Sequence, residues 1–257
     1  MNGNPARATG GTNGPILTMR GVCKYFGRGL ARSASRTAAL RDIDLELRPG
    51  EVLGVIGDEG AGKTALMQCA AGLLRRDAGE IRWLGRSFPG GGLLPGVAYV
   101  PAIPVFYPFL TVRDVLSFRL AKDSTPRQLR EGLMDDALAL TDLGDRAGEL
   151  VAMLSPEAMK QLAIAEAIVC EPEAVLVDTS TADVKPPLQP KRWHALECLA
   201  TRGVAVMIAS RDYAGIGSVT TRLLRLSEGT VIAYGTEHHR SSRIHFSASA
   251  PSRVDPV

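Results

Sequence analysis

The sequence has few cysteines, no long apolar run and little net charge, and each shortage argues against a class of protein. The four cysteines lie far apart and form no CxxC pair, so we expect reduced thiols rather than a zinc site or a disulfide framework. No run approaches the roughly 20 apolar residues of a membrane-spanning helix. The first residues, MNGNPARATGGTNG, lack the apolar segment of a secretory signal peptide.

The charge balance gives no indication of a nucleic-acid partner, and we expect none. The 257 residues carry a formal net charge of only +3, whereas nucleic-acid binding typically needs a strongly basic surface. Apolar residues make up 45% of the chain and charged residues 22%. This composition is typical of a soluble globular protein with a sizeable core.

Apolar runs alternate with segments of helical periodicity, which favours an α/β architecture. Thr111 and Ser155 are expected to cap helices, the second with Pro156 in its first turn. A hairpin at 223–235 is expected to turn at Glu228-Gly229. Strands are predicted at 16–20, 43–48, 51–57, 80–85, 96–100, 173–178 and 204–210, helices at 63–74, 111–121, 127–141, 154–169 and 193–203, a loop at 27–36, and disordered tails at 1–15 and 236–257.

The stretch GDEGAGKT, Gly57 to Thr64, matches the phosphate-binding pattern G-x-x-x-x-G-K-[ST] at all four fixed positions. An apolar strand precedes it and a helical segment follows, which is the context that this loop needs. Its glycines let backbone N–H groups turn towards a phosphate chain, and the helix N-terminus faces the same anion. The residues expected at the nucleotide are Gly57, Gly60, Ala61, Gly62, Lys63 and Thr64, with Lys63 on the β- and γ-phosphates and Thr64 on Mg²⁺.

The simpler alternative for this stretch is a glycine-rich turn before a helix. Asp58 and Glu59 lie inside a loop meant for an anion, and we expect both to point outward. Asp178 ends the buried strand EAVLVD and is the candidate for the second Mg²⁺ position. The alternative for Asp178 is an acid at a strand end that faces solvent.

Over residues 16–235 the chain resembles the ATP-binding cassette (ABC) ATPases, the motor subunits of ABC transporters. The similar segments are RDIDLELRPGEVLGVIGDEGAGKTALMQCAAGLLRRDAGEIRWLG, YPFLTVRDVLSFRL, CEPEAVLVDTST, GVAVMIASRD and LSEGTVIAYGT. The resemblance implies a P-loop fold with a mostly parallel central sheet, an antiparallel β subdomain and a helical subdomain at about 103–170. It also implies ATP and Mg²⁺ as ligands, and a cytoplasmic location on the inner face of the cell membrane.

The resemblance further implies partners and one more contact to the nucleotide. The expected partners are a transmembrane permease subunit and a second ATP-binding subunit, in a homodimer or a heterodimer. Phe26, next to Tyr25, falls where the family stacks an aromatic ring on adenine; the alternative is a core aromatic. Tyr107-Pro108-Phe109-Leu110 falls where the family meets the membrane subunit, and here too a core role is the alternative.

Several family positions carry a different residue in this chain. The signature LSGGQ becomes LSPEA: Ser155 remains as a phosphate contact, but Pro156 and Glu157 replace two glycines. Thr179 stands at the position of the catalytic Glu and cannot act as a base near neutral pH. Ala102 stands at the position of the family Gln. Arg211 stands at the position of the family His, and a shift of one residue would place Ser210 there.

The sequence therefore predicts a transporter subunit that binds Mg-ATP, couples to a membrane subunit and hydrolyses ATP weakly or not at all. No residue is assigned a catalytic role, because the base, Gln, His and signature positions are all substituted. Two alternatives stay open. One is an active transporter ATPase that tolerates the substitutions, and the other is an ATP-binding regulatory protein of ABC fold without a role in transport.

Overall fold

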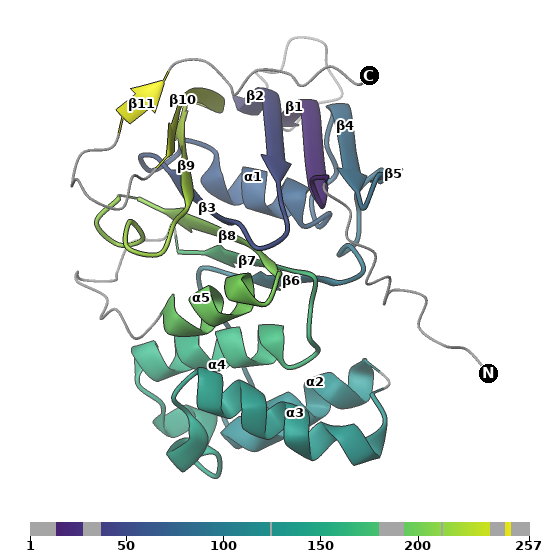
Figure 1. Ribbon diagram of the computed structural model, residues 1–257, viewed down its shortest axis with the longest axis vertical. Coiled ribbons are helices and arrows are strands. Elements are labelled where there is room, and N and C mark those ends of the chain that lie inside the picture. The colour runs from purple at the N-terminus through teal and green to yellow at the C-terminus, as the bar shows by residue number, and fades with distance from the viewer. Residues whose placement is uncertain are drawn as a thin grey trace.

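The computed structural model describes residues 14–27, 37–123, 125–179, 193–211, 213–236 and 245–247. Most of the two expected tails and of the 27–36 loop lies outside these residues. The described chain forms two sheets with one helix between them and a layer of helices below (Figure 1). None of the helices in the described ranges has the length and apolar character needed to cross a bilayer.

The central sheet is mostly parallel and carries the predicted buried strands. Its order is β11-β10-β9-β3-β8-β7-β6, with β9, β3, β8, β7 and β6 parallel and the two strands at the β10 edge antiparallel. Every residue of β3, β7 and β8 is buried, as expected for strands covered on both faces. The bounds are β3 Val52–Ile56, β6 Val97–Val100, β7 Ala174–Asp178, β8 Ala205–Ser210, β9 Arg222–Ser227, β10 Thr230–Thr236 and β11 His245–Ser247.

The second sheet is antiparallel, with the order β2-β1-β4-β5. Its first strand, β1, continues well beyond the predicted 16–20. The register between β1 and its neighbours shifts around Gly21, whose φ of 58° needs a glycine. This irregularity breaks the period-2 pattern and hides the rest of the strand in the sequence. The bounds are β1 Leu17–Phe26, β2 Thr37–Leu47, β4 Ala78–Trp83 and β5 Arg86–Ser87.

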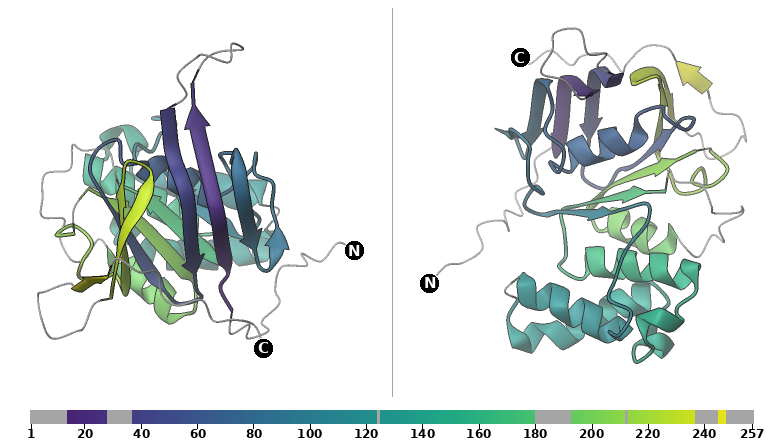
Figure 2. Two further views of the ribbon diagram at one scale, coloured as in Figure 1. Left: turned by 90° about the horizontal axis from the view of Figure 1, so that it is seen from above. Right: turned by 180° about the vertical axis from the view of Figure 1, so that it is seen from behind.

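Helices cover both faces of the central sheet (Figures 1 and 2). Helix α1 packs on β7 and β8 and, on its other side, on β1 and β2, so it lies between the two sheets. The other face of the central sheet packs on α4 and α5, and α2 and α3 pack against α4 in turn. The bounds are α1 Lys63–Ala70, α2 Val112–Lys122, α3 Arg127–Leu140, α4 Pro156–Ile168 and α5 His194–Thr201, with short 3₁₀ helices η1 Gly144–Arg146 and η2 Val151–Met153.

The predicted caps and the predicted turn are confirmed. Thr111 Oγ1 accepts from the N–H of Asp114, and the Asp114 carboxylate accepts from the N–H of Thr111, which forms a full capping box before α2. Ser155 caps α4 by accepting from Ala158 N at 3.2 Å, with proline in the first turn. The β9–β10 hairpin turns at Glu228 and Gly229, which both have positive φ.

Two element ends differ from the expectation. Helix α1 stops at Ala70 rather than at residue 74, because Gly72 has a φ of 82° and leads the chain away from the helix. In the 236–257 segment, where the sequence predicts a disordered tail, Thr236 completes β10 and His245–Ser247 form β11. His245–Ser247 pair with β10. This strand therefore forms because β10 offers hydrogen bonds at the edge of the central sheet, which the sequence of the segment alone does not predict.

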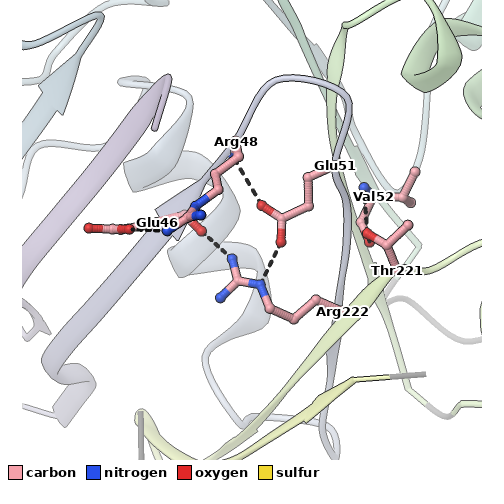
Figure 3. Close-up of polar contacts among 6 residues, drawn as sticks. All are labelled: Glu46, Arg48, Glu51, Val52, Thr221 and Arg222. Carbon is pink, nitrogen blue, oxygen red and sulfur yellow. Dashed lines mark hydrogen bonds and ion pairs between the residues drawn. The ribbon is translucent and has the colours of Figure 1, made fainter. Parts of the chain in front are cut away.

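A half-buried arginine links the two sheets near the start of β3 (Figure 3). Arg222 on β9 donates from Nε to Glu51 Oε1 at 2.5 Å and from Nη2 to the carbonyl of Glu46 on β2. The two charged side chains are only 18% and 12% exposed. Glu51 also accepts from the backbone N–H of Arg48. The network therefore fixes β2 against the strand that leads into the phosphate-type loop.

Replacing this arginine is expected to cost much more stability than replacing an exposed neighbour. Arg222→Ala leaves a largely buried carboxylate without its cation, and we expect a loss of about 3 kcal/mol in the free energy of unfolding. The matched control is Arg48→Ala, whose pair with Glu46 is 3.5 Å long and 61% and 42% exposed; it should cost at most about 1 kcal/mol. Urea unfolding of both variants measures the difference, and equal losses would contradict the structural role given to Arg222.

Candidate nucleotide-binding site

The loop Gly57–Gly62 joins the end of β3 to the start of α1, between the two sheets. A Cβ on Gly57 would lie 2.3 Å from the carbonyl oxygen of Leu226, and a Cβ on Gly62 would lie 2.3 Å from that of Ala39. Gly62 also has a φ of 102°. Both positions therefore require glycine, since β9 and β2 press directly on the backbone of the loop. Two of the fixed glycines of the motif are thus explained by packing.

Lys63, the first residue of α1, is folded inward against the loop. Its side chain is 3% exposed, and Nζ donates to the carbonyl oxygens of Gly57 and Asp58 at 2.7 Å each. Burial lowers the pKa of the Lys63 ammonium, and the carboxylate of Asp178 partly opposes this shift. The loop therefore encloses a cation at the place where the sequence predicts contact with phosphate.

Thr64 and Asp178 meet across the gap between α1 and β7. Thr64 Oγ1 donates to Asp178 Oδ2 at 2.7 Å. Asp178 is 2% exposed, so the alternative of a strand-end acid facing solvent is wrong. A hydroxyl and a carboxylate are hard oxygen ligands of the kind that Mg²⁺ takes alongside phosphate oxygens and water. These two residues therefore fit the expected ion.

Tyr99 is a further residue of this site that sequence reasoning missed. Burial raises the pKa of its phenol to about 12, and the charge of the nearby Asp178 carboxylate adds to the shift. Gln68 of α1 lies close to the same hydroxyl. The register of β6 and β7, with Tyr99 opposite Leu176, brings the phenol near the carboxylate. Only the pairing of these two strands could have identified it.

Thr179 and Ala102, which the resemblance places at the positions of the family's base and Gln, lie together at the carboxyl end of β7. Ala102 and Thr179 line one small cavity together with Asp178, Lys160 and Trp193. The hydroxyl of Thr179 donates to the carbonyl of Ala209 at 2.6 Å, so it is engaged with the neighbouring strand. Neither side chain offers a group that takes up a proton near neutral pH.

Arg211 follows β8 directly and forms an ion pair with the loop. Its Nη2 lies 2.7 Å from Glu59 Oε2. Ser210, the alternative at this family position, is 8% exposed and lies within β8. Asp58 and Glu59 are both exposed, as expected, but the carboxylate of Glu59 is held by this arginine.

Phe26 and Tyr25 are exposed at the end of β1, so a core role for these aromatics is wrong. Their exposed fractions are 46% and 38%, and the ammonium of Lys24 lies 5.6 Å from the centre of the Phe26 ring. The side chain of Phe26 is therefore partly open to solvent, with the Lys24 ammonium over its ring.

Ser155 is not brought together with the loop within this chain. It caps α4, which packs on the face of the central sheet opposite to α1 (Figure 1). Two separate clusters of apolar residues mark these faces: Val175 and Val177 pack in the cluster that contains α4, and Leu176 packs in the one that contains α1. Ser155 and Lys63 therefore begin helices that pack on opposite faces of the central sheet.

Similarity to known proteins agrees with this geometry. A family model described as ABC transporter matches residues 40–182. The chain is 27% identical over 231 residues to the methionine import ATP-binding protein MetN of Brucella abortus (strain 2308), covering 87% of this chain and 60% of the relative. It is 29% identical over 225 residues to the probable multidrug ABC transporter ATP-binding protein YbhF of Escherichia coli (strain K12), and the match covers 87% of this chain and 38% of the relative. The chain thus spans less than two thirds of these relatives.

Solved structures show the same fold. CbiO1 from Clostridium perfringens, described as part of the ABC transporter complex cbiONQ, superposes with a TM-score of 0.73 at 23% identity, covering 87% of this chain and 89% of that one. A nucleotide-free ATP-binding cassette of an ABC transporter gives a TM-score of 0.72 at 20% identity, with coverages of 87% and 92%. The predicted α/β class, with an antiparallel sheet and a helical layer, is confirmed.

Proposed function

The chain belongs to the ABC transporter family, and on this premise we propose that it is a transporter's ATP-binding subunit that holds Mg-ATP without appreciable hydrolysis. The proposal of ATP binding rests on the position of Lys63 inside the loop and of Thr64 beside Asp178. The family binds ATP, typically with Mg²⁺. The phosphate chain would replace the loop carbonyls as partner of the Lys63 ammonium, since a charged acceptor makes the stronger bond.

The metal ion, the adenine base and the β-phosphate each have residues that could receive them. When bound, Mg²⁺ would neutralise charge on the terminal phosphates, with Thr64 and Asp178 as its protein ligands or their water-mediated equivalents. Tyr99 would hold the Asp178 carboxylate in place. The exposed ring of Phe26 offers a face for the adenine base. The loop amides of Gly60, Ala61 and Gly62 and the first turn of α1 would take the β-phosphate.

The proposal of weak hydrolysis follows from the residues around Asp178. Attack on the terminal phosphate needs a group that orients or deprotonates water. Thr179 has no basic atom and its hydroxyl is bound to Ala209 O, and Ala102 has no polar side-chain atom at all. Arg211 can supply positive charge but cannot accept a proton. The site is therefore suited to holding ATP rather than to cleaving it.

A second ATP-binding subunit, identical or not, would complete the assembly. Ser155 would face the nucleotide of that subunit, while Pro156 removes a backbone donor and Glu157 adds a carboxylate at the same place. Glu157 is exposed in the first turn of α4. This chain is therefore expected to contribute weakly to the nucleotide site of the second subunit. We expect the two nucleotide sites of the assembly to differ.

The proposed contact with a membrane subunit is an apolar patch formed by Tyr107, Phe109, Leu150 and Met153. These side chains are 64%, 71%, 45% and 71% exposed. The rings of Tyr107 and Phe109 lie 5.5 Å apart, and the η2 segment bonds to this stretch through Val151 N to Leu110 O. Large exposed apolar groups in one place are typical of a docking site. Such an attachment places the subunit at the inner face of the cell membrane.

Removing the two rings of the apolar patch is expected to abolish this attachment and to spare ATP binding. Aromatic residues at an interface often contribute about 2 kcal/mol each, so Tyr107→Ala with Phe109→Ala should weaken capture of the permease subunit by at least about 100-fold. The measurement is co-purification of a transmembrane permease subunit with the chain from solubilised membranes. Leu129→Ala, an equally accessible apolar residue (58% exposed) on α3, is the control. Absence of a membrane subunit with the wild-type chain would favour a regulatory protein instead.

A further inference from the structure

The ion pair between Glu59 and Arg211 joins two segments that are 152 residues apart in the sequence. Strands β3 and β8 pair in parallel, with Ile56 opposite Ser210. The residues that follow the two strands therefore lie side by side at the carboxyl end of the sheet. The phosphate loop follows β3, and Arg211 follows β8. A guanidinium is thus positioned beside the loop by the sheet itself, and Lys63 experiences its charge.

The pair is of a kind that a better anion can replace. The side chain of Glu59 is 83% exposed and that of Arg211 is 40% exposed, and exposed ion pairs are weak because water and salt screen them. A terminal phosphate carries more charge than a carboxylate and accepts two parallel bonds from a guanidinium. The loop amides hold the inner phosphates and Lys63 reaches the β- and γ-phosphates, which leaves the outer oxygens of the γ-phosphate towards the carboxyl end of the sheet, where Asp178 and Arg211 lie.

We propose that Glu59 is an internal competitor for the terminal phosphate of ATP: it holds Arg211 until the nucleotide arrives, and Arg211 then moves from Glu59 to the γ-phosphate. The inference rests on the proposed function, since it requires ATP on this loop. It gives the chain a way to distinguish ATP from ADP that does not depend on hydrolysis. ADP lacks the third phosphate, so it leaves the Glu59–Arg211 pair intact.

The test compares ATP and ADP affinity, by displacement of a fluorescent nucleotide in the presence of Mg²⁺, among single and double variants of the full chain. Arg211→Gln should lower the affinity for ATP about 10-fold and leave that for ADP unchanged, and Arg211→Lys should restore part of the loss. Glu59→Gln should raise the affinity for ATP about two- to fivefold. This gain should disappear in the Arg211→Gln background, because no competitor remains to be removed.

The matched control is Asp58→Asn, which removes the same charge from the same loop. Among the described residues, the side chain of Asp58 forms no ion pair within 4 Å. Any gain from Asp58→Asn should therefore be the same with and without Arg211. The inference is overturned if Glu59→Gln behaves like this control, or if Arg211→Gln weakens ATP and ADP equally. In both cases the wild-type chain still binds ATP, whereas a wild-type chain that binds neither nucleotide overturns the proposed function as well.

Discussion

Lys63→Ala is expected to lower the affinity for Mg-ATP by at least about 100-fold. The wild-type ammonium is enclosed by the loop and bonded to two of its carbonyl oxygens, so its charge is focused where the phosphates would bind. Its low-dielectric surroundings strengthen the attraction to an anion. Alanine removes that charge from the centre of the loop and leaves only the neutral N–H donors of the loop there. Titration with a fluorescent ATP analogue measures the loss.

The loss must be separated from damage to the fold, because the same substitution leaves the carbonyls of Gly57 and Asp58 without the ammonium. Thermal unfolding without nucleotide should show that the Lys63→Ala chain still melts cooperatively. Lys122→Ala removes an equal charge from the exposed last turn of α2 and should leave affinity unaltered. If Lys63→Ala binds Mg-ATP as tightly as the wild-type chain, the loop is a structural turn and the proposed site is wrong.

The second large effect concerns turnover. Removal of a positioned general base typically slows a reaction by about 10²–10⁴-fold, and the resemblance places Thr179 and Ala102 where the family has its base and its Gln. Such losses need not multiply, since the groups act as one unit. We therefore expect the turnover of bound ATP to be lower than that of an intact family member by at least about 10²-fold. A phosphate-release assay at saturating Mg-ATP measures it.

Restoring the carboxylate alone should not rescue the reaction fully. In Thr179→Glu the new side chain would replace the hydroxyl that now donates to Ala209 O and would point from the end of β7 beside Asp178. Ala102 would still lack the amide of the family Gln, and Arg211 would still lack a group that can accept a proton. A modest rise in turnover is therefore expected, and a rise to the level of an intact ATPase would show that Ala102 and Arg211 are of little consequence.

The loop and the buried position of Asp178 could be predicted because the information is local. Gly57 to Thr64 is a continuous pattern, and Asp178 ends an apolar run that identifies a buried strand. The capping residues Thr111 and Ser155 were predictable for the same reason, since a side chain that caps a helix bonds within three residues. The Glu228-Gly229 turn was predictable from its own two residues and the flanking strands, although Gly229 also bonds to Ala61 of the loop and to Arg41 of β2.

What could not be predicted depends on which strands are neighbours. The contact of Tyr99 with Asp178 follows from the pairing of β6 with β7, and the contact of Arg211 with Glu59 follows from the pairing of β3 with β8. Neither strand pairing can be identified from the residue pattern of a single sequence. The length of β1 was missed because the register shift near Gly21 interrupts its alternation. The expectation that Glu59 points outward was incomplete, because it did not include the ion pair with Arg211 that the pairing of β3 with β8 creates.

ATP binding without appreciable hydrolysis is tested most directly by measuring both quantities on one preparation of the purified chain, with and without candidate partner subunits. We predict saturable Mg-ATP binding that Lys63→Ala abolishes, together with a turnover no higher than that of the same variant. Robust ATP turnover that Lys63→Ala abolishes would contradict this prediction and would identify the chain as an active transporter ATPase that tolerates its substitutions.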